Sequence, residues 1–98
     1  AMGIGHALHE YLPLYEDGPG DGTWNFNRYQ VPRASDVAVW QQTGDILPPL
    51  SETDPPKGMA EVVMIPVVAA VINAIAHASG HYFRHLPVRA DNIKGVFQ

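Results

Sequence analysis

The chain has 98 residues, a net charge of −4 with only six Lys and Arg, and no cysteine. A chain of this length forms one small domain over residues 1–98, and without a basic cluster we expect no nucleic-acid partner. The lack of cysteine excludes disulfides, thiolate metal sites, iron–sulfur ligation and a cysteine nucleophile. The longest apolar run, residues 62–76, is too short to span a membrane, so we expect no membrane partner.

The chain begins with a segment whose pattern predicts a helix over residues 3–11. Ile4, Leu8 and Tyr11 are spaced for one face of such a helix, and Pro13 ends it. We therefore expect these three side chains to pack against the rest of the domain.

The next segments predict strands. Residues 14–16 begin an extended stretch, and the glycine-rich residues 17–22 predict a hairpin turn. Aromatic and polar residues alternate over 23–29, and apolar and polar residues alternate over 36–43, as in half-buried strands. We expect the aromatic side chains to form a core layer of the sheet: Trp24, Phe26, Tyr29 and Trp40.

The C-terminal half predicts a connector, two helices and one strand. Residues 44–57 carry four prolines without helical or strand periodicity and predict an extended connector. A helix is expected over 66–79, with Gly80 as its left-handed cap. A strand over 81–86 and a short helix over 89–96 complete the chain. The sequence thus predicts an α+β fold, a two-layer domain with a small, mostly antiparallel sheet and packed helices.

The predicted helix 66–79 is apolar on more than one face. Its large apolar side chains share one face, and the remainder is mostly alanine, where a solvent-facing surface would carry Lys and Glu. A chain of this length has little else to cover the alanine face. We therefore expect a neighbour there, which for the isolated chain means a homodimer or higher oligomer.

Four short motifs follow one another along the chain. They are Gly3-Ile4-Gly5-His6-Ala7-Leu8-His9-Glu10, then Tyr29-Gln30-Val31-Pro32 with Ser35-Asp36-Val37, then Lys57-Gly58-Met59-Ala60-Glu61, and last Leu86-Pro87-Val88. In this order they resemble the C-terminal end of the molybdopterin-binding large subunit of molybdenum hydroxylases, the xanthine dehydrogenase and aldehyde oxidase family. The chain departs from the family pattern at Ala60, where glycine is usual, and at His6, where glutamine is common.

The resemblance assigns a role to the third motif. It implies that Glu61 is the general base in the hydroxylation of an aldehyde or N-heterocycle, and that Lys57, Gly58, Met59 and Ala60 form the loop that holds Glu61 beside the cofactor. Spacing alone offers a different interpretation, in which Glu61 is a carboxylate favoured by the N-terminal dipole of the following helix.

The resemblance also has consequences for cofactors and partners. A molybdenum–molybdopterin cofactor is expected only in a complete complex, with the remainder of the large subunit and an iron–sulfur subunit as partners, and none on the isolated chain. The alternative function is an orphaned, non-catalytic domain that acts as a binding or assembly module. Without an export leader in the sequence we expect a cytoplasmic location, or a periplasmic one if a partner chain carries the signal.

The histidines do not predict a metal site. His77, His81 and His85 recur every four residues, but Gly80 breaks the helix that would align them. His6 and His9 offer two ligands without a third. We therefore expect these side chains to be solvated or packed.

Overall fold

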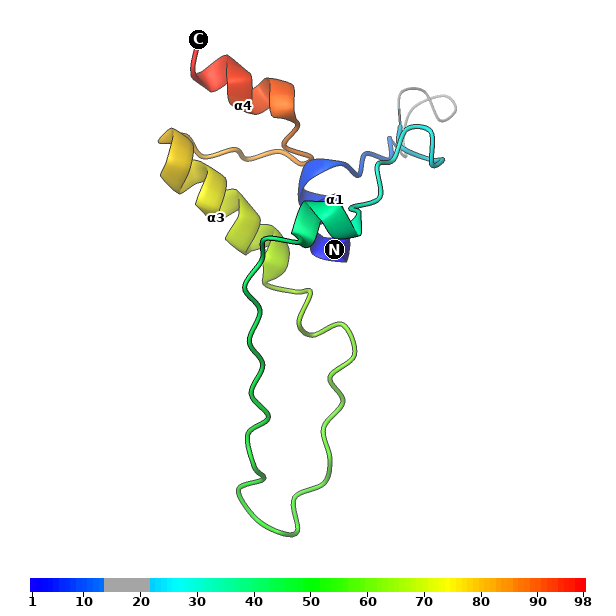
Figure 1. The fold of residues 1–98 in the computed structure, drawn as a ribbon, viewed down its shortest axis with the longest axis vertical. Helices are drawn as coiled ribbons and strands as arrows, with labels where there is room; N and C mark the ends of the chain where they lie inside the picture. Colours follow the sequence, from blue (N-terminus) through cyan, green and yellow to red (C-terminus); the bar gives the residue numbers. More distant parts are fainter. Residues whose placement is uncertain (14–21) are drawn as a thin grey trace.

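The computed structural model describes residues 1–13 and 22–98 of the chain. Within these ranges it contains helices only: α1 (Met2–Leu8), α2 (Ala34–Val37), α3 (Val67–Ser79) and α4 (Ala90–Val96) (Figure 1). No β-strand forms in the described residues, so the expectation of an α+β domain with an antiparallel sheet is wrong. Over the same ranges, every helix falls short of the length and apolar character that crossing a membrane requires.

The predicted strand over 23–29 is replaced by turns that Asn25 organises. The Asn25 side-chain oxygen accepts the N–H of Asn27 at 3.0 Å and that of Arg28 at 3.2 Å, and its carbonyl accepts the N–H of Tyr29 at 2.8 Å. Asparagine offers the backbone these local bonds in place of a strand ladder. The aromatic core layer is absent as well, because Trp24 is 54% exposed and Phe26 83%.

The strand expected over 36–43 fails for a similar reason. The Asp36 carboxylate accepts the N–H of Arg33 at 2.8 Å, and the Asp36 N–H donates to the Arg33 carbonyl at 2.9 Å. These reciprocal bonds between the N-cap residue Arg33 and the third helical residue Asp36 resemble a capping box, which stabilises a helix N-terminus. Residues 34–37 therefore form α2.

The two other predicted strands have different outcomes. Residues 81–86 run without helix and without a ladder partner. The Ser79 hydroxyl oxygen accepts the N–H of His81 at 3.2 Å, which turns the chain away from α3. The extended segment 14–16, and the hairpin turn except for Gly22, lie outside the described residues.

The sequence predicted α3 and its end correctly. The helix runs over Val67–Ser79 with Pro66 as N-cap, and Gly80 has φ 73° with its N–H donating to the Ala76 carbonyl at 2.8 Å. A left-handed residue is where glycine ends a helix without steric cost. The large apolar residues of α3 are half-buried, and most of its alanines are exposed: Ala69, Ala70, Ala74 and Ala78.

The core lies where α1 meets α3. The buried residues of α1 are Gly3, Gly5 and Ala7, whereas Ile4 and Leu8 are only half-buried. The small residues of α1 are thus the ones most completely covered by the rest of the chain, and the larger apolar side chains are covered only in part. The helix ends at Leu8, short of the predicted residue 11, where the N–H groups of His9 and Glu10 both donate to the Gly5 carbonyl.

The segment that precedes the last helix packs against α1. Val88 is 1% exposed and its N–H donates to the Ala7 carbonyl at 2.9 Å. The Asn92 side chain accepts the N–H of Arg89 at 2.9 Å, so α4 begins with the same cap arrangement as α2. The helix over Ala90–Val96 confirms the predicted C-terminal helix.

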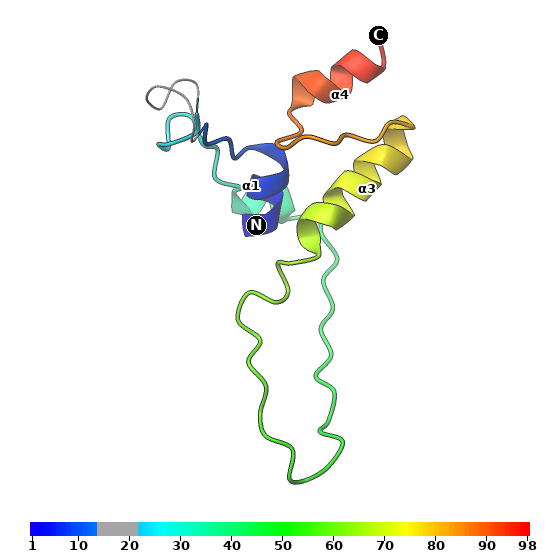
Figure 2. The same ribbon diagram turned by 180° about the vertical axis from the view of Figure 1, so that it is seen from behind.

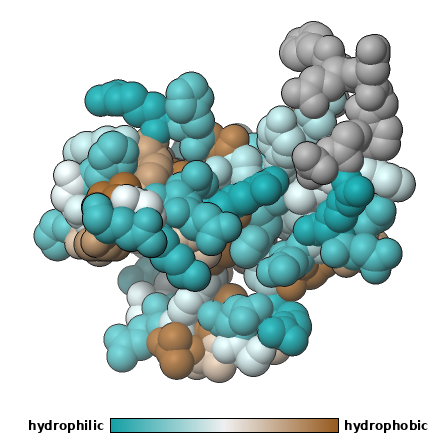
Figure 3. Space-filling model, turned by 90° about the horizontal axis from the view of Figure 1, so that it is seen from above, coloured by the Kyte–Doolittle hydropathy of each residue, from teal (hydrophilic) through white to brown (hydrophobic). Residues whose placement is uncertain are grey.

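A long loop, residues 38–66, separates α2 from α3 and is called the arm below. It leaves the helical body beside α1 and the start of α3 and projects away from α4 in both views (Figures 1 and 2). The radius of gyration is 17.5 Å, against about 13 Å for a compact chain of this length. The opposite end, which carries α4, is mainly hydrophilic with separate apolar patches (Figure 3).

Candidate functional site

The candidate loop, Lys57 to Glu61, lies on the limb of the arm that returns to α3. All five of its residues are exposed. A Cβ added at Gly58 would meet no atom within 4 Å, so nothing in this chain requires a glycine there. Three surface hollows in the described structure are lined by residues outside 41–80.

The backbone at Glu61 has an uncommon conformation. Its φ is 62°, and among the described residues it is the only non-glycine residue with a positive φ. This left-handed conformation costs roughly 1–2 kcal/mol for an L-residue with a side chain. Ala60, which stands where the resembling family has glycine, is free of that strain because its own φ is not positive.

A series of tight turns connects Glu61 to α3. The Val62 N–H donates to the Ala60 carbonyl at 2.8 Å, and the Met64 N–H donates to the Glu61 carbonyl at 2.9 Å. The Val67 N–H in turn donates to the Met64 carbonyl at 3.0 Å. These bonds fix the direction in which the chain passes from Glu61 into the helix.

The carboxylate of Glu61 faces solvent without a partner. Within the described part of the chain it forms no hydrogen bond and no ion pair. It also lies outside the first turn of α3, which begins at Val67 and carries no acidic residue there. The interpretation of Glu61 as a carboxylate held by the dipole of that helix is therefore wrong, because the effect acts within the first turn.

The segment that follows the candidate loop, with the start of α3, lies against α1. A Cβ added at Gly3 would lie 2.7 Å from both Cβ and Cγ1 of Val67 and 3.6 Å from Cγ of Met64. Only glycine permits so close an approach. The sequence did not predict that Met64 and Val67 contact α1. The glycine spacing of the first motif was the signal that another part of the chain approaches that helix closely.

The motifs that are separated in sequence meet around α1. Gly5 lies directly against the Tyr29 hydroxyl, where a Cβ would collide with it, and Ala7, fully buried, accepts the Val88 N–H. Together with the contact between Gly3 and Val67, α1 therefore touches the Tyr-x-x-Pro motif, the Leu-Pro-Val motif and the start of α3. Three of the four motifs thus meet at α1, whereas the third motif, residues 57–61, lies outside this unit on the arm.

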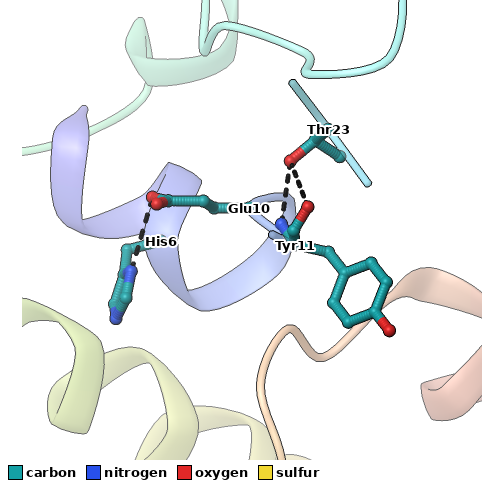
Figure 4. Close-up of polar contacts among 4 residues, drawn as sticks. All are labelled: His6, Glu10, Tyr11 and Thr23. Atoms are coloured by element: carbon teal, nitrogen blue, oxygen red, sulfur yellow. Dashed lines mark hydrogen bonds and ion pairs between the residues drawn. The ribbon is translucent and has the colours of Figure 1, made fainter. Parts of the chain in front are cut away.

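Hydrogen bonds fasten the segment that follows α1 (Figure 4). The Tyr11 N–H donates to Thr23 Oγ1 at 2.8 Å, and the Thr23 hydroxyl and N–H both donate to the Tyr11 carbonyl, at 3.1 and 2.6 Å. His6 Nδ1 lies 3.4 Å from the Glu10 carboxylate on the exposed side of α1. His6 therefore serves as a surface partner of Glu10 in this chain.

His77 and His81 lie on either side of the helix end at Gly80, in different surroundings. His77 is in the last turn of α3, and His81, beyond Gly80, packs edge-on against Phe83 with ring centroids 4.8 Å apart. In the described ranges, no three His, Cys, Asp or Glu side chains come close enough together to hold a metal ion.

Within the described residues, the candidate loop supplies one exposed carboxylate and one lysine on a projecting arm. A large cofactor is normally enclosed by a concave pocket, so this loop would need further protein surface to hold one. Comparison of the chain with protein-family models, curated protein sequences and solved structures gave no match.

Proposed function

We propose that this chain is the C-terminal piece of a molybdenum hydroxylase large subunit, and that it supplies Glu61 as a general base to an active site completed by other chains. The observation that carries the proposal is the conformation of Glu61. Its backbone is strained at φ 62° while its carboxylate stays exposed and unpaired in the described structure. Such outliers persist where the surrounding structure determines them, and they concentrate at functional sites.

The packing of the motifs supports the same proposal. The Tyr-x-x-Pro segment and the Leu-Pro-Val segment both contact the Gly-x-Gly helix α1, and the Lys-Gly-Met-Ala-Glu loop precedes α3, whose Val67 lies against Gly3. The packed helices therefore hold the base of the arm, and the loop projects from it into solvent. An exposed loop held in this way is suited to contact a second protein.

The chemistry assigned to the chain is one proton transfer. The Glu61 carboxylate accepts a proton from a group held by the partner chains and releases it later. In the isolated chain the carboxylate is surrounded by water, which would compete for the proton. The partner must therefore also enclose the loop, and the cofactor is bound by residues of the partner.

Complementation in trans tests the proposal. The chain is added to a molybdenum hydroxylase whose large subunit has been cut ahead of the segment that this chain resembles. Restored turnover of an aldehyde or N-heterocycle supports the proposal, whereas association without turnover contradicts it. An adjacent reading frame that encodes the preceding several hundred residues would identify the natural partner.

The exposed arm favours a second candidate function, that of a non-catalytic binding or assembly module. Ile46 and Leu50 on the arm are 95% and 100% exposed, as expected of side chains that contact a partner. A module of this kind would bind its partner equally well with Glu61→Gln, and the bound complex would have no hydroxylase activity that depends on Glu61.

A further inference from the structure

The exposed surface of this chain is much larger than that of a compact protein of its mass. The accessible area is 8589 Å², against about 5,500 Å² for a folded monomer of 10.7 kDa. The excess is about 3,000 Å². Two copies that each buried half of this excess would bury about 3,000 Å² in total, within the range of permanent interfaces, about 2,000–5,000 Å² in total.

The arm contributes much of that surface. Ile46, Leu47 and Leu50 are 95%, 84% and 100% exposed. Between residues 41 and 59 the only backbone–backbone hydrogen bond in the described structure closes the tip, from the Asp54 N–H to the Ser51 carbonyl at 3.1 Å. The arm therefore presents apolar side chains and unpaired backbone groups together.

The charges of the arm and of the C-terminal segment are opposite. The arm carries four acids and one lysine, a net charge of −3: Asp45, Glu52, Asp54 and Glu61 with Lys57. Residues 67–98 carry three basic residues and one acid, a net charge of +2: Arg84, Arg89 and Lys94 with Asp91. Complementary charge favours association of these two surfaces and sets its orientation.

The C-terminal segment also has an apolar surface that remains uncovered. The exposed residues of α3 include Ala70 and Ala74, whose small side chains let another chain approach closely. The arm of the same chain points away from α4 and does not cover this surface (Figures 1 and 2).

We propose that two copies of this chain associate by exchanging arms, so that the arm of each copy lies on the alanine face of α3 and the basic segment of the other. A two-fold arrangement makes both contacts at once, because each copy offers the same two surfaces. This association uses the same arm as the proposed function, and it concerns the chain in the absence of a large subunit.

Sedimentation of the purified chain measures the molecular mass of its assembly in solution. We expect a homodimer at micromolar concentration, and a monomer at all concentrations would overturn the proposal. A chain that stays monomeric alone and associates only with an upstream large-subunit fragment would also overturn it. Ala74→Glu should raise the dimer dissociation constant at least about tenfold by placing a charge in the apolar contact. The control Ala34→Glu, at the exposed start of α2, should leave the constant unchanged.

Reversal of charges on the arm and on residues 67–98 tests whether these two surfaces contact each other in the dimer. Asp45→Lys with Glu52→Lys changes the net charge of the arm from −3 to +1, and Arg84→Glu with Lys94→Glu changes that of residues 67–98 from +2 to −2. Each double variant alone should dimerise about tenfold more weakly. Mixed in equal amounts, the two should form a heterodimer, because both arm contacts are then attractive. Homodimers as tight as the unmodified chain, or a mixture without heterodimers, would overturn the proposal.

Discussion

Gly3 on α1 lies so close to Val67 at the start of α3 that a Cβ added at Gly3 would be 2.7 Å from Cβ and Cγ1 of Val67. This contact joins the first motif of the chain to the segment that carries Glu61. It fixes the point at which the arm returns to the body, and hence the place from which Glu61 projects.

Gly3→Ala should therefore push α1 and α3 apart. We expect the free energy of unfolding to fall by about 1–3 kcal/mol relative to the control Gly95→Ala, because overpacking costs this much. Gly95 lies in α4 with no atom within 4 Å of an added Cβ, so its replacement gains helix propensity without a clash. Urea denaturation followed by circular dichroism measures both. Equal stability of the two variants would contradict the close packing.

Val88→Ala tests the link between α1 and the segment before α4. Val88 is 1% exposed, and removing two methyl groups there should lower the free energy of unfolding by about 1–3 kcal/mol. The matched control is Val31→Ala outside the arm, where Val31 is 54% exposed and the change should be within about 0.5 kcal/mol. The same denaturation experiment compares them. A loss at Val31 as large as that at Val88 would contradict the tight packing of Val88 against α1.

Thr23→Val tests the fastening of the segment after α1. Valine keeps the shape of threonine but lacks the oxygen that accepts the Tyr11 N–H at 2.8 Å. We expect a loss of about 1 kcal/mol and faster hydrogen exchange at the Tyr11 amide. Thr43→Val, at an exposed site whose side chain forms no hydrogen bond in the described structure, is the control. Unchanged protection of the Tyr11 amide would show that the side-chain bond contributes nothing.

The isolated chain should retain no molybdenum cofactor and should not oxidise aldehydes or purines. One exposed carboxylate on an open loop gives no affinity for a cofactor of that size. Elemental analysis of chain purified from cells that make the cofactor is the measurement. Stoichiometric molybdenum would mean that the chain holds a binding site of its own.

The helices α3 and α4 could be predicted from the sequence because their signals are local. Pro66 suits the position directly before a helix, Gly80 suits its end, and the apolar spacing between them is helical. The strands could not be predicted correctly, because alternation at 23–29 describes a strand only if a neighbouring strand pairs with it. Here Asn25 bonds its own turn, and no ladder partner lies within the described chain.

The candidate site was predicted only in part. The resemblance singled out Glu61, but neither its positive φ nor its exposure had a signal in the sequence, since a glutamate rarely adopts that conformation. The anchoring of the loop depends on Gly3 and Val67, which are far apart in the chain. Contacts of this kind follow from tertiary packing and not from local pattern.

The most direct test of the central claim is the turnover of Glu61→Gln in the complex reconstituted with a truncated large subunit. Glutamine keeps the size of the side chain but cannot accept the proton, so we expect kcat to fall by about 10²–10⁴-fold with molybdenum content and complex formation unchanged. Glu10→Gln, which removes another exposed carboxylate outside the arm, should keep full turnover. Turnover by Glu61→Gln equal to that of the unmodified chain would contradict the role of Glu61 as the general base.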